Sequence, residues 1–221
     1  MDIQTLFSKE SGRAENYRIP SIIKTKSGVL VACADERFFT CRDNPNRIDK
    51  VVRRSLDNGL TWQEQTVAVE EVGDSMKDAS AAIDPCMLYD DNSDTIFMLY
   101  SHTPAGIGIL NCKKGTGQDG DDNLYLYDSK KRYTLKGEKV FDKDGKEVEG
   151  YVVKENGDLI YNGESVGNYK LNSGRLKELR TSHLCIISSS DDGLTWSQPR
   201  NISYQVKEKY MSFFGAGPGV G

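Results

Sequence analysis

Residues 55–62 read SLDNGLTW and residues 189–196 read SSDDGLTW, so the phrase Ser-x-Asp-x-Gly-x-Thr-Trp occurs twice in the chain. Each position suits a tight turn between two strands. The aspartate can accept hydrogen bonds from backbone N–H groups shortly after it, and the glycine adopts a left-handed backbone without a Cβ penalty. The two tryptophans of the chain each end one copy of the phrase. The recurrence therefore predicts an internal β-hairpin repeat.

The composition is that of a globular chain without a nucleic-acid or membrane signature. The net charge is −4, with 37% hydrophobic and 28% charged residues, so a basic stripe for nucleic acid is not expected. No run reaches the roughly 18 apolar residues of a membrane span. The first residues lack the basic and apolar regions of a signal peptide. Five scattered cysteines without a C-x-x-C pair argue for free thiols and against a zinc site or a disulfide framework.

Short runs rich in Val, Ile, Tyr and Phe follow one another, separated by Gly, Asp, Asn and Ser. This rhythm predicts an all-β fold, and no stretch keeps a helical period over three turns. The expected strands are YRIPSIIKT, GVLVACADE, KVVRRSL, TWQEQTVAV, CMLYD, TIFMLYSH and HLCIISSS.

The segment from 113 to 180 is more polar and reads as a small inserted β subdomain. Asn156-Gly157 and Asn162-Gly163 are type I′ hairpin turn signals. The residues 142–145, DKDG, faintly resemble a calcium loop but lack the later ligands, so a solvated hairpin tip is the preferred interpretation and no cofactor is expected. The expected minor core of the subdomain consists of Tyr125, Tyr127, Tyr133, Phe141, Tyr151, Ile160 and Tyr161.

Two charged segments stand out near the N-terminus, YRIP at 17–20 and ADERFFTCRDNPNRID at 34–49. Arg18 enters an apolar strand just before a proline, which places it at a strand end or on an edge. Its guanidinium is either half of a surface salt bridge or a bidentate partner for a carboxylate. Asp43 lies in a loop beside an arginine and a proline, and is either structural or a mobile acid that delivers a proton.

These segments together resemble bacterial exo-sialidases (neuraminidases), in which the repeated phrase is the Asp box, or BNR repeat. The resemblance rests on YRIP, DER, the RDNPNRID loop and both Asp boxes, and it extends through AAIDP, YSHTP and FFGAGPGVG to cover essentially the whole chain. It looks closest to the large secreted clostridial-type sialidases, which carry an insert within the catalytic propeller. The resemblance implies a six-bladed β-propeller, of which about half is present here, with residues 1–112 and 181–221 flanking the insert at 113–180.

The resemblance also implies roles for individual residues. Arg18 matches the first arginine of the triad that holds the substrate carboxylate, Asp43 the acid/base, and Arg37 an arginine near the C4 hydroxyl of the sugar. Ile83 and Asp84 match a pair that lines the pocket for the acetamido group. The Asp-box residues match structural turns on the face away from the site: Ser55, Asp57, Gly59, Thr61, Trp62, Ser189, Asp191, Gly193, Thr195 and Trp196.

The implied activity is hydrolysis of terminal sialic acids with retention, on sialylated glycans outside the cell or at its surface. Arginines suit the anionic substrate because they stay charged at any working pH, and a carboxylate nucleophile would be repelled, which rationalises the tyrosine used by sialidases. In the family that tyrosine, its activating glutamate and two triad arginines follow the GPG segment. We therefore expect this chain to be the N-terminal half, inactive alone, with the C-terminal half as its partner.

Two alternatives remain open from the sequence. One is an intramolecular trans-sialidase that releases an anhydro sugar, for which an extra hydrophobic stack over the aglycone side would be the distinguishing feature. The other is a non-catalytic sialic-acid-binding propeller in which the insert acts as a lectin-like module.

Overall fold

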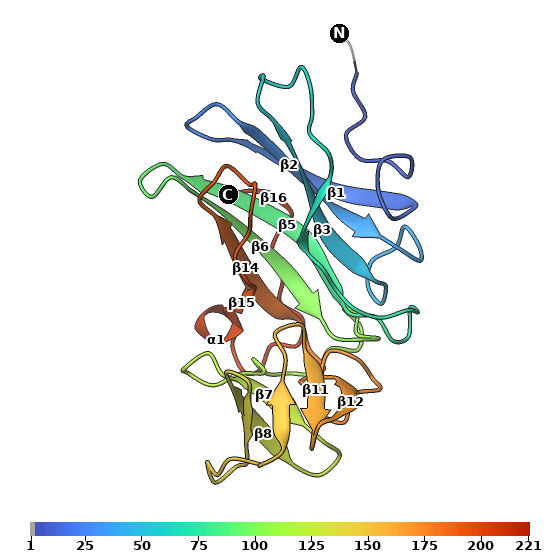
Figure 1. The fold of residues 1–221 in the computed structure, drawn as a ribbon, viewed down its shortest axis with the longest axis vertical. Coiled ribbons are helices and arrows are strands. Elements are labelled where there is room, and N and C mark those ends of the chain that lie inside the picture. Colours follow the sequence, from blue (N-terminus) through green and yellow to red (C-terminus); the bar gives the residue numbers. More distant parts are fainter. Residues whose placement is uncertain (1–2) are drawn as a thin grey trace.

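The computed structural model describes residues 3–221, which fold into an all-β structure with a single four-residue helix, α1 (Ser203–Val206). Figure 1 shows a large twisted sheet assembly and, beside it, a smaller body formed by residues from the middle of the chain. The expected all-β fold with an inserted β subdomain is confirmed. None of the helices within residues 3–221 is long and apolar enough to cross a membrane.

The first part of the large assembly is an antiparallel unit in which each strand pairs with the next one along the chain. The register of its two central strands sets Arg37 opposite Ile48 at one end of the strands and Leu30 opposite Ser55 at the other end. Arg37, the last residue of ADER, therefore lies at the end of the strands away from the first Asp box. The strands are β1 (Asn16–Lys24), β2 (Leu30–Arg37), β3 (Ile48–Ser55) and β4 (Thr66–Val69).

A second antiparallel unit is interrupted by the insert. Its first two strands pair before the chain leaves the sheet at Thr103, and the third returns at His183 beside the second strand. The two units meet where Ile48 bridges to Ala81 in parallel, and the end of the chain adds β16 (Gly219–Val220) parallel to the inner strand. The strands are β5 (Ala81–Asp90), β6 (Thr95–Thr103), β14 (His183–Ser189) and β15 (Arg200–Asn201).

One apolar core joins the two units. It draws side chains from both units, and burial of this apolar area is the main favourable term in their association. Trp196 of the second Asp box packs against it. The buried members are Val29, Val31, Cys33, Val52, Val69, Ala82, Met87, Ile96, Met98, Tyr100, Cys185 and Ile187.

The insert contains two small sheets, one of four strands and one of three. The strands are β7 (Leu124–Tyr127), β8 (Arg132–Lys136), β9 (Lys139–Phe141), β10 (Tyr151–Val153), β11 (Asp158–Tyr161), β12 (Glu164–Asn168) and β13 (Lys177–Glu178).

The core of the insert differs from the expected aromatic set. Its buried members are mostly aliphatic: Leu126, Val140, Tyr151, Val153, Leu159 and Leu176, with Tyr133 and Tyr161 packed against them. Tyr125, Tyr127, Phe141 and Ile160 lie outside this cluster because each sits one position from a buried aliphatic residue, and neighbouring residues of a strand face opposite sides. The sequence expectation favoured large aromatic residues where the smaller aliphatic neighbours point inward.

The two Asn-Gly turns of the insert are of different types. Asn162 and Gly163 both have positive φ, at 51° and 84°, and join β11 to β12 as the expected type I′ turn. At the other turn only Gly157 has positive φ, and its N–H donates to the carbonyl of Lys154 over 2.9 Å. That connection is therefore a type I turn closed by a left-handed glycine, not the expected type I′ turn.

The two Asp boxes form the same set of hydrogen bonds, which confirms the hairpin repeat. In the first, the Asp57 carboxylate accepts from the backbone N–H and the hydroxyl of Thr61, at 2.8 and 2.6 Å, while the Ser55 hydroxyl accepts from the N–H of Gly59 at 2.8 Å. The Thr61 hydroxyl, the Thr61 N–H and the Ser55 hydroxyl all donate to Asp57, and these bonds, the Thr61 hydroxyl first, lower its pKa to about 2. The second box repeats each bond with Ser189, Asp191, Gly193 and Thr195.

Candidate active site

Arg18 leaves the sheet at a bulge in the edge strand β1. The pairing of β1 with β2 shifts between Arg18 and Ser21, and Ile19 inside this bulge has a φ of 55°. A left-handed backbone is unusual for a β-branched residue, and bulges next to active sites commonly re-aim a side chain. Pro20 is tolerated here because β1 is an edge strand. The Arg18 side chain is consequently half exposed, at 47%.

The loop between β2 and β3, which carries Asp43, is held from within by Asn46. This buried side chain donates to the carbonyls of Thr40 and Arg42 at 2.9 and 3.1 Å and accepts from the N–H of Phe39 at 3.1 Å. A buried amide with these three partners fixes the curvature of the loop.

Asn44 anchors the same loop to the second unit. Its amide donates to the hydroxyl of Thr103 and to the carbonyl of Ile107, each at 2.8 Å. The Thr103 hydroxyl ties the loop to the end of β6, so Asp43 is carried by a loop that is fixed on both sides.

The structure brings Arg18, Arg37 and Asp43 together. The Asp43 carboxylate lies 2.7 Å from Nη1 of Arg37 and 3.5 Å from Nη1 of Arg18, and both arginines donate to the carbonyl of Cys41. The exposures differ sharply, at 65% for Asp43 and 0% for Arg37. Arg18 and Asp43 thus face solvent as an open pair, while the Arg37 side chain lies behind Asp43 and has no exposed surface.

Two residues that the sequence did not single out lie beneath Arg37. Asp35 accepts from Nη2 of Arg37 at 2.7 Å and also pairs with Lys50, and all three side chains are fully buried. The signal that would have revealed them is charge inside apolar strands, in ACADER and in IDKVV, because Lys and Asp are almost never fully buried unless paired.

Ile83 and Asp84 differ in position. Asp84 lies in a bulge of β5, with a φ of 60°, and burial, reinforced by nearby Asp35, raises the pKa of its carboxyl. Ile83 is only 2% exposed and packs with Ile48 and Ala81, so its side chain is in the core and not on an open wall. Asp84 is the member of the pair that shares the electrostatic surroundings of Arg37 and Asp43.

Tyr17 forms a separate pair on the other face of the first unit. Its hydroxyl donates to Glu36 at 2.6 Å, and Arg13 donates to the same carboxylate. Because Glu36 and Asp35 are consecutive in a strand, they face opposite sides of the sheet. Burial and the Glu36 carboxylate raise the pKa of Tyr17, so this tyrosine is not an activated phenolate.

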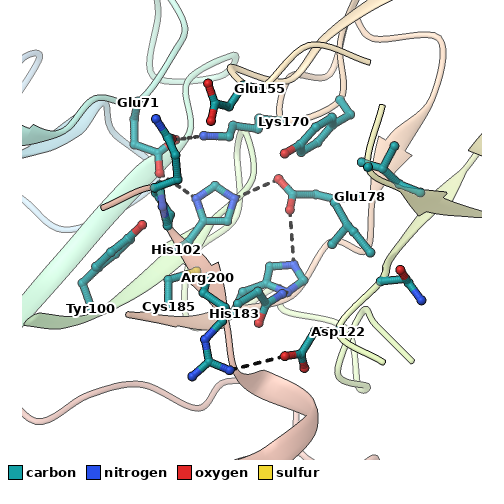
Figure 2. Close-up of a pocket in the computed structure, with 18 residues that line it drawn as sticks. Glu71, Tyr100, His102, Asp122, Glu155, Lys170, Glu178, His183, Cys185 and Arg200 are labelled. Carbon is teal, nitrogen blue, oxygen red and sulfur yellow. Dashed lines mark hydrogen bonds and ion pairs between the residues drawn. The ribbon is translucent and has the colours of Figure 1, made fainter. Parts of the chain in front are cut away.

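A second charged cluster lies where the insert meets the second unit, in a cavity of about 530 Å³ that does not include Arg18 or Asp43. Figure 2 shows the His102 ring between two carboxylates: Nδ1 lies 2.7 Å from Glu71 and Nε2 lies 2.8 Å from Glu178. Lys170 pairs with Glu71 at 3.2 Å, and His183 lies 3.5 Å from Glu178.

The protonation states of this cluster follow from its geometry. Burial disfavours the charged imidazolium, but the carboxylates of Glu71 and Glu178 outweigh it and raise the pKa of His102 to about 10. Burial lowers the pKa of His183 to about 4, so that ring is neutral. Two carboxylates therefore face two cations, His102 and Lys170, and the cluster is a charge-balanced joint between insert and sheet.

Comparisons with known proteins give sialidases. No protein-family model matches the chain. The anhydrosialidase of Macrobdella decora is 24% identical over 93% of this chain and 33% of its own length, and sialidase B of Streptococcus pneumoniae is 23% identical over 92% of this chain and 36% of its own. The crystal structure of the intramolecular trans-sialidase from Ruminococcus gnavus, in complex with oseltamivir carboxylate, superposes with a TM-score of 0.83 at 24% identity, covering 94% of this chain and 52% of that one.

These similarities show the fold of the chain and the kind of domain that it resembles. The fold is that of the β-propeller family of sialidases, and the sequence and structural similarities together support a bacterial sialidase-type domain. The chain spans about a third of the length of the curated relatives it matches.

Proposed function

We propose that this chain supplies the first part of the active site of an exo-α-sialidase, which releases terminal sialic acids from glycoconjugates with retention of configuration. The observation that carries the proposal is the solvent-exposed pair of Arg18 and Asp43, 3.5 Å apart beside the loop that follows β2. The similarity to sialidases supports the same substrate class. A location outside the cell or on its surface, where such glycans occur, is part of the proposal.

Arg18 would hold the substrate carboxylate. Sialic acid carries this anion on its anomeric carbon, and a planar guanidinium binds a carboxylate through two parallel charge-assisted hydrogen bonds. The side chain is half exposed, and among residues 3–221 it donates only to the Cys41 carbonyl besides its contact with Asp43, so donors remain for a ligand. Asp84 would line the pocket beside it.

Asp43 would act as the acid that protonates the leaving oxygen and then as the base that deprotonates water. The nucleophile must come from another group, since a carboxylate would be repelled by the substrate anion. Tyr17 is held by Glu36 on the far face and does not suit that role. We infer that residues beyond this chain supply the tyrosine and the remaining triad arginines, and that the isolated chain has no turnover.

Intramolecular transfer is a second candidate. It is favoured by the similarity to the leech anhydrosialidase and to the intramolecular trans-sialidase of Ruminococcus gnavus. Hydrolysis gives free sialic acid, whereas intramolecular attack gives an anhydro sugar lighter by one water. Mass spectrometry of the product released from a sialyllactose by the full-length protein distinguishes the two.

The proposal is tested by replacing Asp43 with asparagine in the full-length protein and measuring turnover of a fluorogenic sialoside. Loss of the acid is expected to lower kcat by about 10² to 10⁴-fold. Asp144→Asn is the matched control, because Asp144 is an exposed residue at a hairpin tip of the insert, with a 72% exposed side chain, and turnover should be unchanged.

Unchanged turnover in Asp43→Asn would contradict the assignment of Asp43. If the wild-type protein binds sialosides without any turnover, the non-catalytic sialic-acid-binding propeller replaces the enzyme as the better account. If it neither binds nor cleaves them, the proposed substrate class is wrong.

A further inference from the structure

Lys50 is a fully buried lysine near the start of strand β3. A lysine without solvent must have partners for its charge and its donors. Its Nζ donates to Asp35 and, over 2.5 Å, to the carbonyl of Ala82. One ammonium group thereby connects three strands: β2 through Asp35, β3 through its own backbone, and β5 through Ala82.

Asp35 connects Lys50 to the candidate site through Arg37. Asp35 uses one oxygen for Lys50 and the other for Nη2 of Arg37, at 2.7 Å, while Nη1 of Arg37 lies 2.7 Å from Asp43. The guanidinium is therefore held between two carboxylates, one buried and one exposed. Without Asp35, none of residues 3–221 on the buried side of Arg37 would accept a hydrogen bond from its guanidinium and fix its plane.

Ala82, the second partner of Lys50, lies in the second unit close to Asp84 of the candidate site. Ala82 stands two residues before Asp84, where the register of β5 shifts and the backbone becomes left-handed. The carbonyl of Ala82 accepts from Lys50, so the start of this bulge is fixed relative to β3. Lys50 thus sets the position of Asp84 relative to Arg37 across the junction of the two units.

Stability alone does not account for this arrangement. Replacing a buried ion pair by apolar residues of similar volume is often neutral or stabilising, so such a pair is weak evidence of a stabilising role. Its distinguishing property is geometric, because hydrogen-bonded charges lock side-chain orientation in a way that apolar contacts do not.

We propose that Lys50 and Asp35 are positioning residues of the catalytic site, which fix Arg37, and through it Asp43, together with the Asp84 bulge in the geometry that the reaction needs. This inference rests on the proposed function. Neither residue touches the substrate, since both side chains are fully buried.

The test uses Lys50→Met, Asp35→Asn and the double variant in the full-length protein, with kcat and KM measured on a fluorogenic sialoside. We expect each to lose about 10- to 100-fold in kcat/KM, mainly through kcat, which is the usual effect of removing supporting groups or displacing a catalytic group. The double variant leaves neither member of the pair behind as an unpaired charge, so it is expected to fold even where a single variant does not.

Lys207→Met is the matched control. Lys207 is also buried, and its Nζ donates to Thr181, Ser182 and Ser212, none of which belongs to the candidate site. We expect it to lower the thermal unfolding midpoint while kcat/KM of the folded protein stays within about twofold, because it removes buried polar bonds without changing the site.

The outcomes separate this inference from the proposed function. If wild-type protein is active and the double variant keeps kcat/KM within twofold, the positioning role is wrong and the sialidase function stands. If wild-type protein has no turnover, the proposed function fails, and a crystal structure of Lys50→Met still decides the inference. An unmoved Arg37–Asp43 contact and Asp84 bulge would overturn it, and displaced groups would support it.

Discussion

The glycines of the two Asp boxes have the same backbone conformation but different surroundings. Gly59 has a φ of 91° and Gly193 a φ of 80°. A Cβ added at Gly59 would lie 3.4 Å from the flexible end of Leu30, whereas at Gly193 it would lie 3.0 and 3.2 Å from the two methyl groups of Val31. Val31 is fully buried in the core between the units, so it has no room to move away.

We therefore predict that Gly193→Ala lowers the thermal unfolding midpoint more than Gly59→Ala does. Both substitutions impose a left-handed backbone on alanine, which costs about 1 kcal/mol, and overpacking against Val31 adds roughly 1 to 2 kcal/mol at Gly193 alone. Calorimetry of the two variants side by side measures the difference. A larger loss for Gly59→Ala would contradict this description of the second box.

The sequence allowed Arg18 and Asp43 to be selected together because their motifs are specific, and the structure places them 3.5 Å apart. It did not reveal Asp35 and Lys50, since a single sequence does not show which buried charge pairs with which. The burial of Ile83 was missed for a related reason. Ile83 and Asp84 are consecutive in β5, so their side chains point to opposite faces of the sheet, and the sequence alone did not show which of the two faces the core.

The insert and the second unit are joined by charges whose effect on stability depends on pH. The pKa of His102 is raised from 6.5 to about 10, so its contribution is complete below pH 6.5 and is lost as the pH rises through 10. The pKa values of Glu71 and Glu178 are lowered, so their contributions are present above pH 4.5 and are lost in acid. His183, with its pKa lowered to about 4, costs stability as the pH falls below 6.5. The joint is therefore expected to be most stabilising near about pH 6.5.

His102→Ala is predicted to destabilise the protein by about 3 to 5 kcal/mol at neutral pH, because it leaves Glu71 and Glu178 buried without their shared cation. His183→Ala is the control and should cost less, since His183 is neutral and Glu178 keeps His102. Thermal unfolding at several pH values measures both. The deficit of His102→Ala should shrink in acid, where the carboxyl groups can take up protons, and a deficit that grows in acid would contradict the assigned charges.

The strands were more predictable than the packing of the insert. All seven strand-like runs of the sequence overlap observed strands of the two large units, because alternation and turn residues act locally. The inward-facing residues of the insert were assigned by size, and the structure buries Leu126, Val140 and Leu159 in place of their larger neighbours. Strands this short give too few alternations to fix the buried face.

In the large assembly, the Asp-box turns and the candidate site lie at opposite ends of the strands. Arg54 donates to the backbone carbonyl of Asp192 at 2.8 Å, and Ser27 donates to its carboxylate at 2.9 Å, so the first unit is tied to the second Asp box. At the other end of the strands, the Asn44 amide donates to the Thr103 hydroxyl and so ties the Asp43 loop to the second unit. The local motifs predicted each unit, but the contacts between units depend on three-dimensional packing that no motif encodes.

The most direct test is a crystal structure of the full-length protein with a 2,3-didehydro sialic acid analogue, which resembles the oxocarbenium-like transition state. The analogue is predicted to place its carboxylate in bidentate contact with Arg18 and its anomeric carbon beside Asp43. An analogue bound away from both residues, for example in the cavity beside His102, would contradict the account.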